Sequence, residues 1–277
     1  MGKAVRLDKF LADAGVGTRS EVKKLIQKGQ ILVNSAAVKK PEEKVRVPED
    51  KVFYQGKEIS APAEFEYYLL NKPAGCVSAV EDARDKTVMD YVPSGRKGLF
   101  PVGRLDKDTE GLLLITDDGI LAHELLSPKK HVEKTYYAVV DGQVTEVDVR
   151  AMEKGVDIGE KRPTLPARLE ILSVKEMASV DKGSNAASAE KGQKESPFSL
   201  CSSWQSEIRL TICEGKFHQV KRMMEAVGKR VVYLKRISMG PLVLPPDLEK
   251  GKCRPLTDTE VENLKKQAET IEKTGIF

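Results

Sequence analysis

The hydrophobic pattern is most distinctive at residues 112–115, where four apolar residues, Leu-Leu-Leu-Ile, follow one another. A run of this length predicts a buried strand, because it is too short for a helix of its own. The preceding loop, residues 101–111, is polar and glycine-flanked and carries Arg104 and Asp106. Asp106 therefore lies next to an anchored core segment, where a reactive carboxylate can be held still. The alternative is that the loop is an ordinary solvated turn.

Helical spacing of apolar residues appears twice near the amino terminus. Residues 7–14 place their apolar side chains on one helix face, and the capping-box pattern Thr18–Glu21 begins a second helix. Short apolar segments between residues 31 and 54 predict small strands joined by turns. These elements form a compact unit, which we place at residues 1–60.

The remaining chain, residues 61–277, mixes more strands with a few helices. Strands are predicted at residues 66–72, 134–140, 167–171, 208–212 and 230–237, and helices at residues 120–126, 219–227 and from 258 onwards. Few βαβ units are present, which favours an α+β fold with a mostly antiparallel mixed sheet. Residues 177–203, rich in Ser, Lys, Gly, Ala and Glu, predict a flexible insertion at a hairpin tip.

Charge is distributed unevenly along the chain. Residues 1–60 contain 13 Lys/Arg and 8 Asp/Glu, whereas the remainder contains 33 and 34. The net charge of +4 therefore comes from the first unit. A basic module attached to a near-neutral body is typical of a protein that binds phosphate groups.

Cysteine and histidine positions indicate no metal site. Four cysteines lack a CxxC pair, and three histidines are scattered, so we expect reduced thiols and no metal. No signal peptide is recognisable and no apolar run approaches 18 residues. These features predict a cytoplasmic protein that does not interact with a membrane.

The first unit resembles the S4-type RNA-binding module. The matching stretches are residues 6–11, 20–22 and 29–34. The resemblance implies that four basic residues outside the apolar helix stripe face RNA phosphates, namely Arg19, Lys23, Lys24 and Lys28. The alternative is that these side chains only keep a small helix soluble.

Three motifs in the second part resemble those of bacterial rRNA pseudouridine synthases of the RsuA family. The first is Gly103-Arg104-Leu105-Asp106 with the segment up to Gly119, the second is Lys134-Thr135-Tyr136, and the third spans residues 214–223. Their order, together with the S4-like module, extends the resemblance over nearly the whole chain. Residues 177–203 lie outside all three motifs.

The resemblance implies isomerisation of a uridine in ribosomal RNA without a cofactor. Asp106 would be the catalytic carboxylate, which has to stay ionised, and Lys221 its cationic partner. Tyr136 would stack on the target base and assist proton removal from C5, whereas Tyr137 is the better candidate for a core aromatic. Arg104 would contact phosphates or fill the gap left by a flipped nucleotide.

Further RNA contacts implied by the third motif are Lys216, His218, Gln219 and Arg222. Ribosomal RNA or an assembling ribosomal subunit would be the partner of a monomer, with 16S rRNA favoured over 23S rRNA. Two other functions stay open from the residues alone. One is a non-catalytic RNA-binding or ribosome-assembly factor, and the other is a glycoside hydrolase using Asp106 and Asp108.

Overall fold

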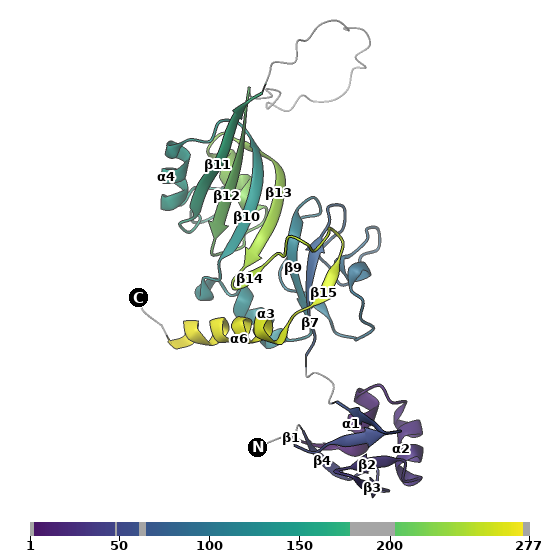
Figure 1. Ribbon diagram of the computed structural model, residues 1–277. Coiled ribbons are helices and arrows are strands. Elements are labelled where there is room, and N and C mark those ends of the chain that lie inside the picture. Colours follow the sequence, from purple (N-terminus) through teal and green to yellow (C-terminus); the bar gives the residue numbers. More distant parts are fainter. Residues whose placement is uncertain (1–2, 48, 61–64, 178–202, 274–277) are drawn as a thin grey trace, which may run out of the picture. The chain divides into compact units, whose positions relative to one another are not determined.

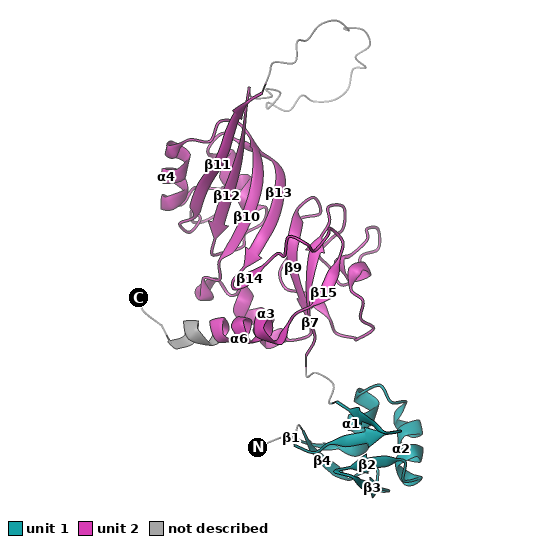
Figure 2. Cartoon of the chain, viewed as in Figure 1, with its two compact units in different colours: residues 1–64 teal, residues 65–277 magenta. Residues whose placement is uncertain are grey.

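The computed structural model describes residues 3–47, 49–60, 65–177 and 203–273. The chain divides into two compact units, residues 1–64 and 65–277 (Figures 1 and 2). Each unit has its own hydrophobic core, as expected of structures that can form separately.

The first unit packs two helices against small sheets. Its helices are α1 (Leu7–Asp13) and α2 (Arg19–Gln27), and Thr18 closes the predicted capping box with Glu21. A four-stranded sheet has the order β3 (Ala36–Val38), β2 (Ile31–Val33), β5 (Val52–Tyr54), β6 (Lys57–Ile59). A separate pair joins β1 (Lys3–Arg6) to β4 (Lys44–Val47). The predicted helices and strands of this unit are confirmed.

The second unit is built on a nine-stranded sheet. Along its main path the order is β11 (Arg168–Glu176), β12 (Trp204–Ile212), β10 (Lys134–Asp141), β13 (Arg230–Met239), β9 (Glu110–Thr116), β7 (Tyr67–Lys72), β15 (Cys253–Pro255). Two short strands, β8 (Phe100–Pro101) and β14 (Leu242–Val243), pair with β9 and β13. All of these pairings are antiparallel except that of β13 with β9, so the predicted mixed sheet is confirmed.

Strand β9 is buried along its whole length, which explains its continuous apolar run. Leu113 and Ile115 pack into one hydrophobic cluster, and Leu112 and Leu114 pack into another on the opposite face. A strand covered on both faces has no solvent side that would require polar residues. The loop containing Asp106 therefore leads directly into the best-buried strand of the unit.

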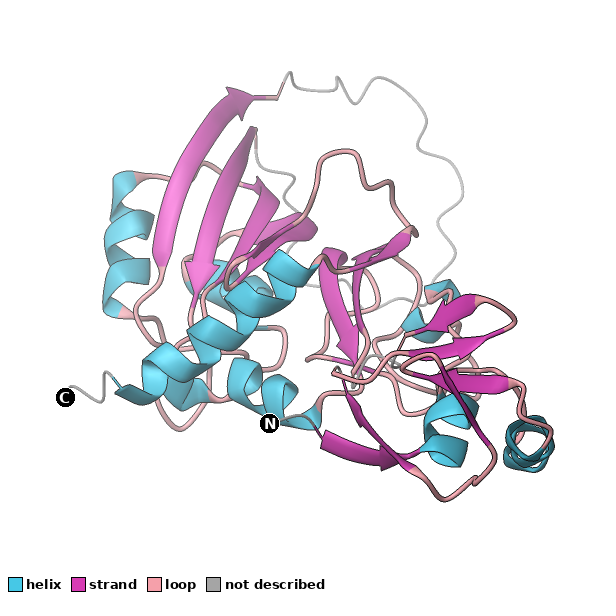
Figure 3. Ribbon diagram, turned by 60° about the horizontal axis from the view of Figure 1, so that its bottom comes forward, coloured by secondary structure: helices cyan, strands magenta, loops and turns pink. Residues whose placement is uncertain are grey.

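Helices cover the sheet at several places (Figure 3). They are α3 (Gly119–Leu126), α4 (Glu146–Lys154), α5 (Gln219–Ala226) and α6 (Asp258–Lys273), with short 3₁₀ turns at Val88–Tyr91 and Pro128–Lys130. Helix α4 was not predicted, although Thr145 and Asp148 form a capping box at its start. Of its nine residues, Asp148 and Met152 are buried.

The predicted insertion falls largely on residues 178–202, which lie outside the described residues, as does Cys201. Its flanks pair as neighbouring antiparallel strands, with Glu176 opposite Trp204. Cys76, Cys213 and Cys253 are free thiols. Within the described ranges, no helix combines the length and apolar composition needed to cross a bilayer.

Candidate active site

An open pocket of about 460 Å³ lies where the loop before β9 meets the start of α5. Its lining residues are Ala74, Gly75, Asp106, Lys107, Asp108, His218 and Lys221. Charged side chains from two distant parts of the sequence therefore share one small volume.

Lys221 is the cation that contacts both carboxylates of this pocket. Its Nζ lies 3.0 Å from Asp106 Oδ2, and 2.7 and 2.9 Å from the two oxygens of Asp108. His218 Nε2 lies 3.5 Å from Asp106 Oδ1. Asp106 and Lys221 are each about a quarter exposed, whereas Asp108 is largely exposed. One ammonium thus pairs with two carboxylates at the pocket, of which Asp106 is the more enclosed.

The pKa values of the pair formed by Lys221 and Asp108 favour the charged forms. Partial burial raises the pKa of Asp108, but the hydrogen bonds and charge of Lys221 outweigh it, so the net shift is downward. Burial lowers the pKa of Lys221, and its bonds to Asp108 and Asp106 more than reverse this, so its net shift is upward. Proton exchange between these groups at neutral pH is therefore disfavoured.

Lys72, at the end of β7, holds the Asp106 loop through its buried ammonium. Its side chain is fully buried, and Nζ lies 2.9–3.3 Å from the carbonyl oxygens of Pro73, Asp106, Lys107 and Thr109. Desolvation lowers the pKa of Lys72, partly offset by nearby negative groups including Asp108 and Asp106. A buried cation with carbonyl ligands orders the loop because each contact fixes a backbone oxygen.

Further bonds fix the loop on both sides of Asp106. Ser78 Oγ accepts from Leu105 N at 3.1 Å and donates to Leu105 O at 2.9 Å. Gly75 N donates to Lys107 O at 2.7 Å. The carboxylate of Asp106 is therefore carried by a backbone with little freedom to move, as a preorganised site requires.

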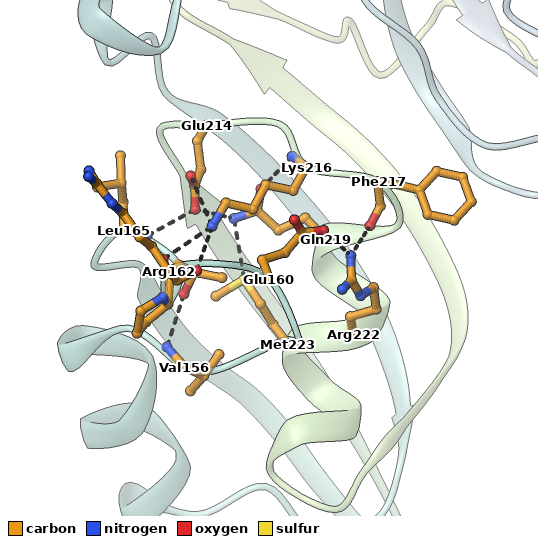
Figure 4. Close-up of polar contacts among 12 residues, drawn as sticks. Val156, Glu160, Arg162, Leu165, Glu214, Lys216, Phe217, Gln219, Arg222 and Met223 are labelled. Atoms are coloured by element: carbon orange, nitrogen blue, oxygen red, sulfur yellow. Dashed lines mark hydrogen bonds and ion pairs between the residues drawn. The ribbon is translucent and has the colours of Figure 1, made fainter.

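The segment before α5 is held by its own polar network (Figure 4). Gln219, only 4% exposed, accepts from Lys216 N and donates to Glu214. Lys216 Nζ donates to the carbonyls of Arg162 and Pro163. Arg222 pairs with Glu160 and donates to the carbonyls of Phe217 and Ile158. Lys216, Gln219 and Arg222, predicted as RNA contacts, thus make bonds within the protein and do not line the pocket, whereas His218 does.

Tyr136 lies in a hydrophobic core cluster of the second unit. It is 8% exposed and belongs to the same cluster as Leu105 and Val220, the neighbours of Asp106 and Lys221. It does not line the pocket, and none of the described residues hydrogen-bonds its hydroxyl. Tyr137, predicted as the core aromatic, is the more exposed of the two and donates to Glu207 at 2.8 Å. The alternation of β10 turns Tyr136 inward with Ala138 and Val140.

The other predicted RNA contacts are exposed side chains. Arg104 is exposed beside the pocket loop and does not line the pocket. The four basic residues of α2 and its end, Arg19, Lys23, Lys24 and Lys28, are exposed in the first unit. No group of three potential metal ligands occurs in the part of the chain that the structure describes.

Little in the sequence predicts the role of Lys72. It follows an apolar strand segment and precedes Pro73, which predicts a strand end at the surface. Only the fold reveals that the strand end is covered by the Asp106 loop.

Comparisons with known proteins agree with these features. Residues 66–226 match the family profile for RNA pseudouridylate synthase, and residues 5–52 match that of the S4 domain. The chain is 42% identical over 262 residues to the uncharacterized RNA pseudouridine synthase YtzG of Bacillus subtilis, covering 94% of this chain and 98% of the relative. It is 37% identical to ribosomal small subunit pseudouridine synthase A of Haemophilus influenzae, covering 95% and 100%.

A solved structure shows the same relationship. A crystal structure of a pseudouridylate synthase aligns with a TM-score of 0.58 at 36% identity, covering 94% of this chain and 99% of the other. The matched profile spans more than half of the chain, and the identity to full-length relatives exceeds one third. The chain therefore belongs to the RsuA family of RNA pseudouridine synthases, with an S4 domain at its amino-terminal end.

Proposed function

We propose that the protein converts one specific uridine of 16S ribosomal RNA to pseudouridine, with Asp106 as the catalytic carboxylate. The observation that carries this proposal is the contact between Asp106 and Lys221 inside the pocket, 3.0 Å between Oδ2 and Nζ. The small-subunit substrate is supported by the likeness to ribosomal small subunit pseudouridine synthase A. The partner would be 16S rRNA, either free or in an assembling ribosomal subunit. The protein would act on it in the cytoplasm as a monomer.

The reaction exchanges one bond for another at the ribose. The N1–C1′ bond breaks, the uracil turns, C5 bonds to C1′, and the proton on C5 leaves to solvent while N1 gains one. Charge changes at the sugar and the ring during these steps, so an ionised carboxylate nearby can act as nucleophile or stabiliser. Lys221, in contact with Asp106, would supply a counter-charge at the carboxylate when the RNA excludes water.

The target nucleotide has to leave the base stack to reach Asp106. Flipping costs a few kcal/mol, which protein contacts with the RNA have to offset. Arg104, which is exposed in the loop before β9, would contact the RNA backbone or fill the gap. Tyr136, which lies in the same hydrophobic cluster as Leu105 and Val220, would stack on the base. The basic residues of the S4 unit would add binding that depends on phosphate charge.

Hydrolysis of the glycosidic bond is the less favoured chemistry. A glycosidase needs one carboxyl group that stays protonated as the general acid. Asp108 is the second carboxylate of the pocket, yet its pKa lies below the ordinary value because of Lys221. Asp108, held in its charged form by Lys221, does not supply that acid.

The test uses full-length 16S rRNA transcripts labelled with [5-³H]uridine. Wild type should release tritium stoichiometrically and leave one pseudouridine on mapping, and Asp106→Asn should release none while still binding the transcript. A matched 23S transcript should release no tritium. Turnover of the 23S transcript alone would overturn the substrate assignment, full activity of Asp106→Asn would overturn the role of Asp106, and free uracil would indicate hydrolysis.

A further inference from the structure

Phe217 is an exposed aromatic side chain beside the candidate active site. It is 72% exposed, in a chain whose aromatic content is only 5%. A single exposed apolar side chain is common and carries no meaning by itself. Its surroundings give this one a specific geometry.

The Phe217 ring stacks on the imidazole of His218. The ring centroids are 3.8 Å apart and the planes are inclined by 19°. His218 lines the pocket, with Nε2 at 3.5 Å from Asp106 Oδ1. The Phe217 ring therefore stacks on a residue that lines the pocket and is itself mostly in solvent.

The backbone beneath these rings is fixed. Arg222 donates to Phe217 O at 3.2 Å, while its other bonds go to Glu160 and Ile158. His218 adopts a left-handed conformation, φ 50°, as the residue that caps α5. In Figure 4 the Phe217 ring points away from the cluster of polar side chains. Lys216, Gln219 and Arg222 thus hold this segment through bonds within the protein, and the Phe217 ring stays exposed.

We propose that Phe217 and His218 form a stacking platform for an RNA base next to the flipped uridine. This inference rests on the proposed function, because it requires an RNA whose target nucleotide enters the pocket. Extraction of one nucleotide exposes the faces of its neighbours, and an aromatic ring at the rim can replace the lost stacking partner. Stacking accepts any base, so the platform strengthens flipping without reading sequence.

The experiment compares variants of Phe217 on the naked 16S transcript. Phe217→Ala should lower kcat/KM for tritium release by roughly 5- to 150-fold, the range expected for one lost base–aromatic stack. Phe217→Trp and Phe217→Tyr should keep kcat/KM within about threefold of wild type. Phe217→Leu should not, because its side chain is apolar but has no flat face on which a base can stack. In an Asp106→Asn background, Phe217→Ala should weaken transcript binding in the same direction. The melting temperature should stay unchanged in all of these variants, because the ring is mostly in solvent.

Ile120 provides the matched control. It is 77% exposed and lies on α3, away from the pocket lining. Ile120→Ala should leave kcat/KM within twofold of wild type. An equal loss in Ile120→Ala, or full rescue by Phe217→Leu, would overturn the stacking role.

Failure of this inference is distinguishable from failure of the proposed function. If wild type releases no tritium from either rRNA, the proposed function fails. If wild type is active and Phe217→Ala stays within twofold of it, only the platform is wrong. A defect of Phe217→Ala that appears with ribosomal subunits but not with the naked transcript would assign the ring to a protein contact and overturn the platform.

Discussion

Lys221 Nζ lies 3.0 Å from Asp106 Oδ2, although the two residues come from different elements of the second unit. Lys221 also binds Asp108, so removing the ammonium would leave two neighbouring carboxylates of one loop without their shared cation. Lys221→Met should therefore lower the single-turnover rate of tritium release by about 100-fold or more, the scale for losing one charge-stabilising donor in an active site. Lys221→Arg should retain part of the activity.

Asp108→Asn is the matched control for that prediction. It removes the exposed carboxylate and keeps the pair of Asp106 with Lys221, so the rate should fall less than about tenfold. If Asp108→Asn abolished turnover while Lys221→Met did not, Asp108 rather than Lys221 would be the essential neighbour of Asp106.

Lys72 should stabilise both the fold and the active-site loop. Lys72→Met would leave several buried carbonyl oxygens without a donor, at a cost of about 1–3 kcal/mol for each one that water cannot reach. We expect a loss of about 2–4 kcal/mol in the free energy of unfolding, measured with urea, and a lower rate in the fraction that stays folded. Lys107→Met removes only the half-exposed pair with Asp85 and should change stability by less than about 1 kcal/mol. Equal stability of Lys72→Met and wild type would contradict the anchoring role.

Gly111 is required by the parallel contact between β9 and β13. Its φ is +102°, and a Cβ there would lie 2.2 Å from the carbonyl oxygen of Arg236. Gly111→Ala should destabilise the protein by more than about 3 kcal/mol, since both the conformation and the strand contact would have to change. Gly119, at the start of α3, has no atom within 4 Å of such a Cβ. Gly119→Ala should therefore be neutral or stabilise by up to about 1 kcal/mol, and a comparable loss at both positions would refute the steric reason.

Lys134 predicts a specific dependence of stability on pH. Burial, reinforced by the nearby charge of Arg236, lowers its pKa from 10.5 to about 8. Between pH 8 and 10.5 the unfolded chain binds more protons at this site than the folded chain, so raising the pH stabilises the fold. Relative to Lys134→Met, wild type should gain at most about 3 kcal/mol over this range and nothing below pH 8.

The measurement for Lys134 is urea unfolding at several pH values, with exposed Lys154 as the control. Lys154→Met should show the same pH dependence as wild type, because its side chain lies in solvent on α4. A parallel pH profile for wild type and Lys134→Met would show that burial does not perturb this lysine.

Local patterns in the sequence were sufficient to determine most of the elements. The capping box Thr18–Glu21, the alternation in residues 134–140 and the continuous apolar run of β9 depend on neighbours within a few residues. Helix α4 was not predicted, although its capping box of Thr145 and Asp148 is also a local pattern. Asp106 could be predicted as a candidate because its motif is contiguous.

The tertiary structure alone decided how these elements act together. Lys72 became the anchor of the Asp106 loop because strand β7 ends beneath it, a relation that no spacing along the chain expresses. Likewise, Lys216, Gln219 and Arg222 found partners across the fold, and Phe217 was left exposed beside the pocket. Whether a charged side chain stays available for RNA depends on which distant carbonyls and carboxylates fold close to it, and sequence order does not specify those distances.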